Sequence, residues 1–310
     1  MQLVPAELQP RGVEPRTSHA ISSMRTIAIV NHKGGCGKTT TAVNLAGCLA
    51  AQGRRVLLVD ADPQAHATLA LGINPDAIDA NLYDVLAEPI GSARLEDVVL
   101  PVRDGLDLAP SGIALGALEP RLAGERLERR SEHLAAALAG ASARYDFTLI
   151  DCPPNLGILT LGALRAAREA IIPVEMSFFA IDGVQRLHEA VSLLCERIKH
   201  TVRMQILATI FDGRTRFCRE TLAELRQLFH SQCFDTVIRS NVTLREAAKR
   251  RLPIAWYAPT ANGASDYAAL AAEVQAAHTV QRVDLRSESS NRLSETLDLS
   301  RFTDPPSASG

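Results

Sequence analysis

The feature that most constrains this chain is a glycine-rich stretch at residues 31–41, which reads Asn-His-Lys-Gly-Gly-Cys-Gly-Lys-Thr-Thr-Thr. It follows an apolar run at residues 26–30 and opens a segment rich in alanine and leucine. A buried strand, a glycine loop and a helix start in this order can hold a phosphate chain. The loop N–H groups and the positive end of the helix both attract negative charge. The stretch therefore predicts a phosphate-binding loop between a strand and a helix.

The residues expected to hold the phosphates are Gly34, Gly35, Cys36, Gly37, Lys38, Thr39 and Thr40. The glycines let backbone N–H groups turn toward the phosphates, and Cys36 contributes its own N–H. We expect Lys38 to reach the outer phosphates and Thr39 to bind Mg²⁺. The stretch departs from the ordinary phosphate-loop pattern, because His32 occupies a usual glycine position and a second lysine, Lys33, lies at the loop entrance.

The composition limits the kind of protein that carries this loop. With 310 residues, of which 46% are hydrophobic, the chain can bury a sizeable core, most simply as one large domain. A net charge of -2 disfavours a basic coat but allows a local basic patch. No apolar run approaches the ~18 residues that cross a bilayer. The six cysteines include no Cys-x-x-Cys pair, which fits reduced thiols. We therefore expect a cytoplasmic protein.

The chain divides into three segments by composition. Residues 1–23 are rich in proline and serine and lack the apolar core of a secretory signal, so we expect a flexible extension. Met24, directly before the first strand, is a candidate for an alternative start of the chain. Residues 24–280 carry the periodic pattern of an ordered domain. Residues 281–310 are rich in Ser, Asp, Glu and Arg, which predicts a disordered tail.

Short apolar runs recur along the ordered segment and predict its fold class. They lie at residues 26–30, 55–60, 147–151, 170–174 and 205–210, each separated from the last by at least one helix-length segment. Such alternation predicts an α/β protein with a doubly wound, mostly parallel sheet flanked by helices, as in P-loop proteins. Ligands of these sheets bind at the carboxyl ends of the strands.

Two of these strands end in an aspartate. Mg²⁺ on a nucleotide is held by the loop hydroxyl and by a carboxylate at a neighbouring strand end, so we assign Thr39 and Asp151 to the metal, with Asp60 in support. Asp62, in Asp-Ala-Asp-Pro-Gln, is a candidate to orient the attacking water. The alternatives are ordinary ones: a capping or turn aspartate at 151, and a turn aspartate before proline at 62.

Taken together, these segments resemble the ParA/Soj branch of the deviant Walker ATPases, whose superfamily also includes MinD and the nitrogenase iron protein. The resemblance rests on the loop at 33–40, on Val-Asp-Ala-Asp-Pro-Gln at 59–64 and on Ile-Asp-Cys-Pro-Pro at 150–154. It continues through shorter matches as far as Tyr-Ala-Pro at 257–259. It therefore spans about residues 25–275 of the chain.

The resemblance implies a homodimer that encloses two ATP molecules, in which Lys33 reaches the partner's nucleotide. A lysine at the loop entrance is favourable there because phosphate charge receives it; the alternative is a solvated lysine. Hydrolysis of ATP to ADP and phosphate would be slow, Mg²⁺-dependent and stimulated by a ParB-like protein or another adaptor. Asn241 matches the position that contacts adenine, and the absence of a guanine-reading Asn-Lys-x-Asp motif favours ATP.

Nonspecific DNA binding is also implied by the resemblance, through basic residues near the carboxyl end of the fold. The candidates are Arg214, Arg216, Arg239, Arg245, Lys249, Arg250 and Arg251. Residues 243–246 match a capping box, which predicts a helix from residue 244 with Arg245 and Lys249 on one face. The family's usual Pro-Arg-Asn-Val-Arg is replaced by Arg-Ser-Asn-Val-Thr at 239–243, so individual contacts differ. The alternative is a solvated run of charges.

The resulting hypothesis is a nucleoid-associated ATP switch that positions or segregates a chromosome, a plasmid or a protein assembly. A MinD-like ATPase that cycles on membranes would need an amphipathic basic helix at the carboxyl end, for which residues 281–310 carry too little apolar surface. An iron–sulfur protein would need paired cysteine ligands, and Cys152 and Cys218 have no partner at a recognisable spacing. The sequence does not identify the cargo.

Overall fold

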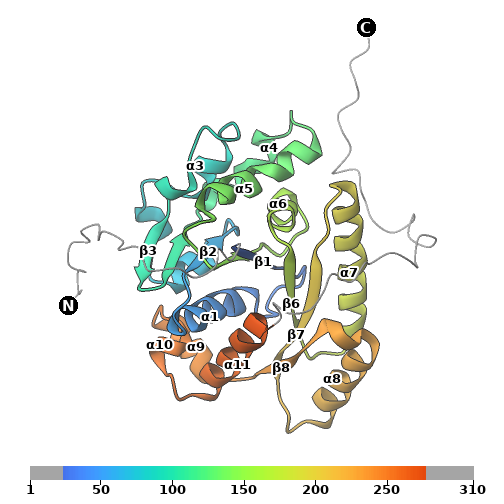
Figure 1. Cartoon of the computed structure of the whole chain (residues 1–310). Coiled ribbons are helices and arrows are strands. Elements are labelled where there is room, and N and C mark those ends of the chain that lie inside the picture. The colour runs from blue at the N-terminus through green and yellow to red at the C-terminus, as the bar shows by residue number, and fades with distance from the viewer. Residues whose placement is uncertain (1–23, 277–310) are drawn as a thin grey trace.

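An eight-stranded sheet forms the centre of the protein, seen in a computed structural model that describes residues 24–276 (Figure 1). Its strand order is β3-β4-β2-β5-β1-β6-β7-β8. The strands are β1 Arg25–Ile29, β2 Val56–Asp60, β3 Leu100–Arg103, β4 Leu106–Ala109, β5 Phe147–Asp151, β6 Glu169–Glu175, β7 Arg203–Phe211 and β8 Cys233–Arg239. All neighbours are parallel except β3 and β4. The mostly parallel α/β sheet expected from the sequence is confirmed.

Helices cover both faces of the sheet. They are α1 Lys38–Ala51, α2 His66–Ala70, α3 Leu82–Leu86, α4 Leu118–Arg121, α5 Leu127–Ala141, α6 Ile158–Ala166, α7 Ala180–Arg197, α8 Arg216–Phe229, α9 Val242–Lys249, α10 Ile254–Tyr257 and α11 Asn262–Ala276. One core cluster joins α1, α9, α10 and α11 to one face of the sheet, and another joins α3, α5, α6, α7 and α8 to the other face (Figure 1). This two-sided cover makes the sheet doubly wound.

The central strands are apolar throughout because both of their faces are buried. In β2, Leu57 and Val59 belong to one core cluster, whereas Val56 and Leu58 belong to the other. Successive side chains of a strand point to opposite faces, so a strand covered on both sides reads as a continuous apolar run. This is why the five predicted strands were recognisable from the sequence.

The edge of the sheet beyond β2 was not predicted. Strands β3 and β4 are four residues long each and form an antiparallel pair around Gly105, whose φ is +85°. The residues of β3 alternate between half-buried and exposed, so the strand does not appear in the sequence as an apolar run. Strand β8 was also missed. No helix among residues 24–276 is long and apolar enough to span a bilayer. The predicted extension 1–23 and tail 281–310 lie outside the described residues.

The register of the sheet aligns the strand ends that matter for the site. Strand β5 lies between β1 and β2, and its last residue, Asp151, is paired with Ile29 on one side and Asp60 on the other. On the other side of β1, Glu175 at the end of β6 is paired with Thr209 of β7. All these strands are parallel, so their carboxyl ends meet at one edge of the sheet. The glycine loop leaves β1 at this edge.

Candidate nucleotide-binding site

The glycine loop has the conformation of a phosphate cradle. Gly35 and Gly37 have φ values of +77° and +92°, a left-handed region that side chains disfavour. A Cβ added at Gly34 or Gly35 would meet no atom within 4 Å, so the space above these residues is open. Gly37 also caps α1 without a side-chain hydrogen bond. The first N–H groups of α1 are therefore directed at the loop, where an anion can accept them.

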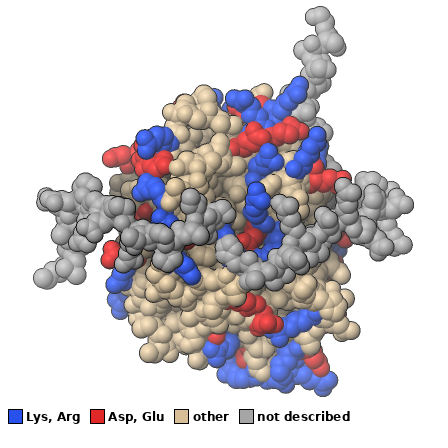
Figure 2. Space-filling model, viewed as in Figure 1, with Lys and Arg blue, Asp and Glu red and all other residues tan. Residues whose placement is uncertain are grey.

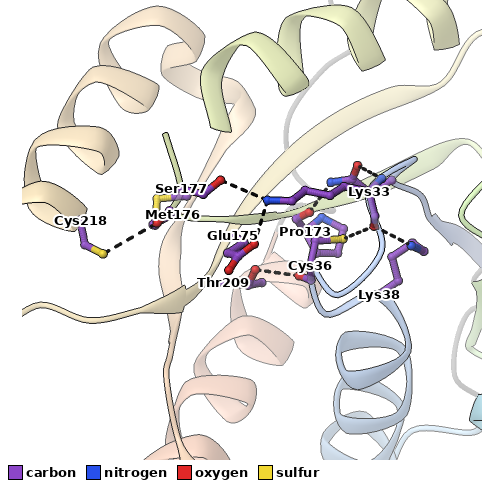
Figure 3. Close-up of polar contacts among 10 residues, drawn as sticks. Lys33, Cys36, Lys38, Pro173, Glu175, Met176, Ser177, Thr209 and Cys218 are labelled. Atoms are coloured by element: carbon purple, nitrogen blue, oxygen red, sulfur yellow. Dashed lines mark hydrogen bonds and ion pairs between the residues drawn. The ribbon is translucent and has the colours of Figure 1, made fainter. Parts of the chain in front are cut away.

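Hydrogen bonds from β6 and β7 hold the loop in place. The hydroxyl of Thr209 donates to the Cys36 carbonyl at 2.8 Å (Figure 3). The amide of Asn31 donates to the Pro173 carbonyl at 2.7 Å. The buried Cys36 thiol donates to the carbonyl of Lys33 at 3.2 Å. These long-range contacts orient the loop, and sequence reasoning had assigned no role to Thr209 or Asn31.

The two lysines of the loop have different surroundings. Lys38 is buried, and its Nζ donates to the Lys33 carbonyl at 3.1 Å, so the side chain folds back over the loop. The Nζ of Lys33 instead reaches out of the loop to Glu175 Oε2 at 2.8 Å and Ser177 Oγ at 3.2 Å (Figure 3). Neither acceptor was predicted. Glu175 is the last residue of β6, so the strand-end rule that identified Asp60 and Asp151 could have identified it too.

Asp151 is a buried carboxylate that its neighbours compensate only in part. Its side chain is fully buried, and neither oxygen has a hydrogen-bond partner among residues 24–276. Burial, and then the charge of Asp60, raise the pKa of Asp151 well above its ordinary value; the Thr39 hydroxyl and Lys38 offset only part of this rise. An unpaired buried carboxylate is costly unless a proton or a cation neutralises it. The position is therefore suited to a cation that arrives with a ligand.

Asp60 and Asp62 organise the loop that follows β2. Both oxygens of Asp60 accept hydrogen bonds, Oδ2 from the N–H and hydroxyl of Thr68 at 2.8 and 2.7 Å, and Oδ1 from Asp62 N at 3.2 Å. Burial raises the pKa of Asp60 to about 6. Asp62 Oδ1 accepts from Gln64 N at 2.9 Å, as in a turn before proline. Asp60 therefore holds the loop that carries Asp62, and its predicted support of the Mg²⁺ shell stays a prediction.

The donor set near the glycine loop fits a nucleotide-bound Mg²⁺. Among residues 24–276, no three His, Cys, Asp or Glu side chains converge to hold a metal ion by themselves. Mg²⁺ is usually bound by one or two carboxylates together with phosphate oxygens and water. The Asp151 carboxylate, with the Thr39 hydroxyl beside it, matches that requirement. Thr40 lies next in the first turn of α1 and is exposed.

The start of α9 differs from the prediction. The helix begins at Val242, and Asn241 is its N-cap, with Oδ1 accepting from Thr243 N at 2.8 Å. The predicted capping box at residues 243–246, with a helix from 244, is wrong because β8 ends at Arg239 and leaves Asn241 in extended conformation one residue before the helix. Asn caps helices well. The amide oxygen of Asn241 is thus engaged in the cap, and its adenine contact stays a prediction.

Three of the predicted DNA contacts are already paired with acids. The pairs are Arg214 with Asp212 at 2.8 Å, Arg216 with Glu220 at 2.6 Å, and Arg239 with Asp266 at 2.6 Å. The hydrogen bonds from Arg214 lower the pKa of Asp212 to about 2. Figure 2 shows basic side chains gathered at the bottom of the view, where α8 lies, with a few acidic side chains among them.

The other four candidates form what we call the α9 basic cluster, defined as Arg245, Lys249, Arg250 and Arg251. All four are exposed, and none makes an ion pair within the part of the chain that the structure describes. Three of them are consecutive at the carboxyl end of α9, where cations are favoured by the helix dipole. The structure thus separates the predicted basic residues into a paired group and an unpaired group.

Comparison with known proteins shows that the chain is similar to ATPases. A family model described as "AAA domain" matches residues 24–204. The chain is 39% identical over 254 residues to the sporulation initiation inhibitor protein Soj of Bacillus subtilis, covering 81% of this chain and 98% of that protein. It is 41% identical over 257 residues to the chromosome-partitioning ATPase Soj of Thermus thermophilus, covering 82% and 97%.

A solved structure has the same arrangement. The cobyrinic acid a,c-diamide synthase of Mycobacterium smegmatis, with a bound ATP analogue and magnesium, matches with a TM-score of 0.71 and 30% sequence identity. The match covers 81% of this chain and 94% of that one. The sheet and helices described above are therefore shared with a protein that binds such a nucleotide together with magnesium.

Proposed function

Because the chain belongs to the ParA/Soj family of P-loop ATPases, we propose that it is an ATP-dependent dimerising switch that binds DNA nonspecifically and positions or segregates a cargo. The observation that carries this proposal is the unpaired, fully buried carboxylate of Asp151 beside a glycine loop with two lysines. A buried carboxylate of this kind fits a cation that enters with a polyphosphate. The cofactors proposed are therefore ATP and Mg²⁺.

The loop residues would bind and orient the phosphates. The N–H groups of Gly34 to Thr40 would donate to the phosphates, and Lys38, which now donates to the Lys33 carbonyl, would turn to the outer phosphates. Thr39 and Asp151 would hold Mg²⁺, which when bound neutralises phosphate charge and polarises the γ-phosphate. Asp60 keeps the following loop in place through Thr68.

Asp62 is the proposed residue that orients the attacking water. It is buried two residues after β2, and its carbonyl accepts a hydrogen bond from the Ser111 hydroxyl at 2.7 Å, which ties this loop to the segment that follows β4. A positioned carboxylate can accept a proton from water or orient it toward phosphorus. The turn that Asp62 makes with Gln64 is compatible with this role, because it uses Oδ1.

Apolar side chains beside the loop support a homodimer. Phe178 and Phe179 are 82% and 68% exposed and pack edge to face against each other. They directly follow Ser177, which contacts Lys33, and the exposed Ile113 lies after β4 at the same edge of the sheet. Exposed apolar residues gathered on one side of a protein mark an interaction surface. We assign this edge to the second copy of the chain that Lys33 would reach.

The output of the switch is proposed from the relatives and from the α9 basic cluster. Chromosome-partitioning relatives support a role in segregation or positioning, with a ParB-like or other adaptor that stimulates hydrolysis. Exposed, unpaired cations suit phosphate contacts that do not read sequence. The protein would then be cytoplasmic and associated with the nucleoid. The membrane-cycling alternative depends on residues 281–310, which lie outside the described residues.

The test of this proposal separates binding from hydrolysis. Lys38→Ala should abolish ATP binding, measured by titration calorimetry with Mg²⁺. Asp62→Ala should retain ATP-dependent dimers in analytical ultracentrifugation while phosphate release slows at least tenfold. Asp104→Ala, at an exposed turn aspartate, is the matched control and should resemble the wild type. Unchanged phosphate release in Asp62→Ala would refute the role of Asp62, and a protein that stays monomeric with ATP would refute the switch.

A further inference from the structure

The side chain of Lys33 is bound to its own chain. Its ammonium lies 2.8 Å from Glu175 Oε2 and 3.2 Å from Ser177 Oγ, and Figure 3 shows it extended from the loop toward both acceptors. This is the only ion pair of a lysine among residues 24–276, since the other ion pairs there are made by arginine or histidine. Lysine is a compact charge on a flexible stem, which makes this contact easier to release than an arginine fork.

The acceptors are held rigidly beside the loop. Glu175 ends β6 opposite Thr209, whose hydroxyl donates to the Cys36 carbonyl in the loop. Ser177 N donates to the Glu175 carbonyl at 2.8 Å, and the Ser177 carbonyl accepts from Ala180 N at 3.0 Å at the start of α7. The segment that receives Lys33 is therefore fixed by the sheet and by α7. Only the lysine has to move for the contact to break.

We propose that Glu175, assisted by Ser177, is a positioning residue that retains Lys33 on its own chain and competes for it with the phosphates of the nucleotide in the partner subunit. The proposal rests on the proposed function, in which Lys33 reaches across the dimer. An ammonium paired with a carboxylate at 2.8 Å cannot deliver its charge to a phosphate elsewhere until that pair opens. Each subunit thus carries a restraint that dimerisation must release.

The strength of the Lys33–Glu175 ion pair depends on how far its two side chains are exposed to water. The Lys33 and Glu175 side chains are 46% and 35% exposed, and exposed ion pairs change an equilibrium by up to about fivefold. A polyphosphate carries several negative charges, so it can outcompete one carboxylate. A symmetric dimer opens two such pairs, so their effects multiply to as much as about 25-fold in the dimerisation constant. The restraint is weak enough to release and strong enough to measure.

The position of the pair supports a role in assembly. Ser177 is followed directly by Phe178 and Phe179, the exposed aromatic pair of the proposed dimer surface. The Lys33–Glu175 contact therefore lies at the edge that the partner would cover. An ion pair elsewhere on the surface, such as Arg216–Glu220 on α8, has no such relation to the loop.

The experiment compares the dimerisation of three variants with that of the wild type. Sedimentation equilibrium is measured with Mg²⁺ and a non-hydrolysable ATP analogue at low ionic strength. Glu175→Gln should tighten the dimer by about 2- to 25-fold, because the amide has lost the charge that retains Lys33. Ser177→Ala should tighten it less. Glu220→Gln removes the same charge from an exposed ion pair away from the loop, and should leave the constant unchanged.

A salt series distinguishes this role from a structural one. The advantage of Glu175→Gln should shrink toward unity near 1 M salt, because the Debye length falls to about 3 Å. A change in packing would persist at high salt. If the wild type dimerises and Glu175→Gln dimerises equally or more weakly, the proposed restraint is wrong and the proposed function is unaffected. If no variant dimerises with the analogue, the proposed function fails and this inference fails with it.

Discussion

At the scale of the residue, the site concentrates groups that a folded core ordinarily avoids. Asp151 is fully buried with no hydrogen-bond partner among the described residues, and Asp60 beside it has a pKa raised to about 6. Their neighbour Lys38 is buried as well and rests on a backbone carbonyl. Such groups destabilise the fold on their own, so their arrangement is understandable as preparation for a charged ligand.

Asp151→Asn should stabilise the protein in the absence of nucleotide. The change removes a buried charge whose desolvation costs about 1–3 kcal/mol, which corresponds to a rise in melting temperature of about 2–10 °C for a chain of this size. The variant should gain nothing from Mg²⁺·ATP, whereas the wild type should gain. Thermal unfolding followed by circular dichroism, with EDTA or with Mg²⁺·ATP, measures both effects. A variant less stable than the wild type in EDTA would contradict the assignment.

We also predict that the difference in stability between Asp151→Asn and the wild type depends on pH. Because the folded pKa of Asp151 is raised, the folded state binds its proton more tightly than the unfolded state. Its contribution to stability is therefore present at low pH and lost as pH rises above the ordinary carboxyl value. The difference in melting temperature between Asp151→Asn and wild type should be small near pH 4 and grow toward pH 8. A constant difference across this range would show that the aspartate is not the cause.

At the scale of the element, α1 connects the glycine loop to the helices on the same face of the sheet. An added Cβ at Gly47 would lie 2.4 Å from Pro253 Cβ, so α1 packs against the start of α10 too closely to leave room for a larger side chain at residue 47. Asn44 Oδ1 accepts from Ile254 N at 2.7 Å, and Thr41 Oγ1 lies 3.3 Å from the Tyr267 hydroxyl of α11. These contacts fix the helix whose first turn would meet the phosphates.

Gly47→Ala should destabilise the fold although alanine favours helices. The new methyl group must displace Pro253, and overpacking of this kind costs about 1–3 kcal/mol. Gly183→Ala is the matched control, because Gly183 lies within α7 and its Cβ would meet nothing within 4 Å. That change should stabilise by about 0.4–1 kcal/mol. Urea unfolding measures both, and equal effects of the two substitutions would contradict the packing argument.

At the scale of the whole molecule, charge is distributed unevenly although the chain carries a net charge of only -2. The face in Figure 2 mixes basic and acidic side chains. Three arginines proposed to bind DNA are neutralised by acids of the same chain, whereas the α9 basic cluster is not. A protein with little net charge can still bind DNA through such a local excess of cations. We therefore expect the α9 basic cluster to contribute the larger share of the proposed DNA affinity.

The double variant Arg245→Ala, Lys249→Ala should weaken DNA binding by the ATP-bound protein. Each lost phosphate contact lowers the slope of log K against log salt by about 1, so the slope should fall by about 2. Fluorescence anisotropy with duplexes of unrelated sequence, over a series of salt concentrations, measures this. The matched control is Arg214→Ala, Arg216→Ala, whose arginines are paired, and it should change the slope less. A larger effect in the control would assign DNA binding to α8.

The sequence by itself determined the parts that depend on local pattern. Apolar runs identified five central strands because both of their faces are buried, and glycine spacing identified the loop because only a few residues tolerate its backbone. Asp60 and Asp151 were recognisable because parallel strands present their last residues at one edge. The sequence did not predict the antiparallel strands β3 and β4, because each is only four residues long and carries a weak apolar pattern. It did not predict the Asn241 cap either, because Thr243 two residues later also matches a capping pattern.

Only the tertiary structure decided which charges meet. Lys33 and Glu175 are 142 residues apart, and Arg239 and Asp266 come from different elements, so no local pattern predicts either pair. The same holds for the isolation of Asp151, which depends on β1 and β2 covering it from both sides. Pairing and burial are properties of neighbours brought together by the sheet register. They determine which of the predicted residues are free to act on a ligand and which are already engaged.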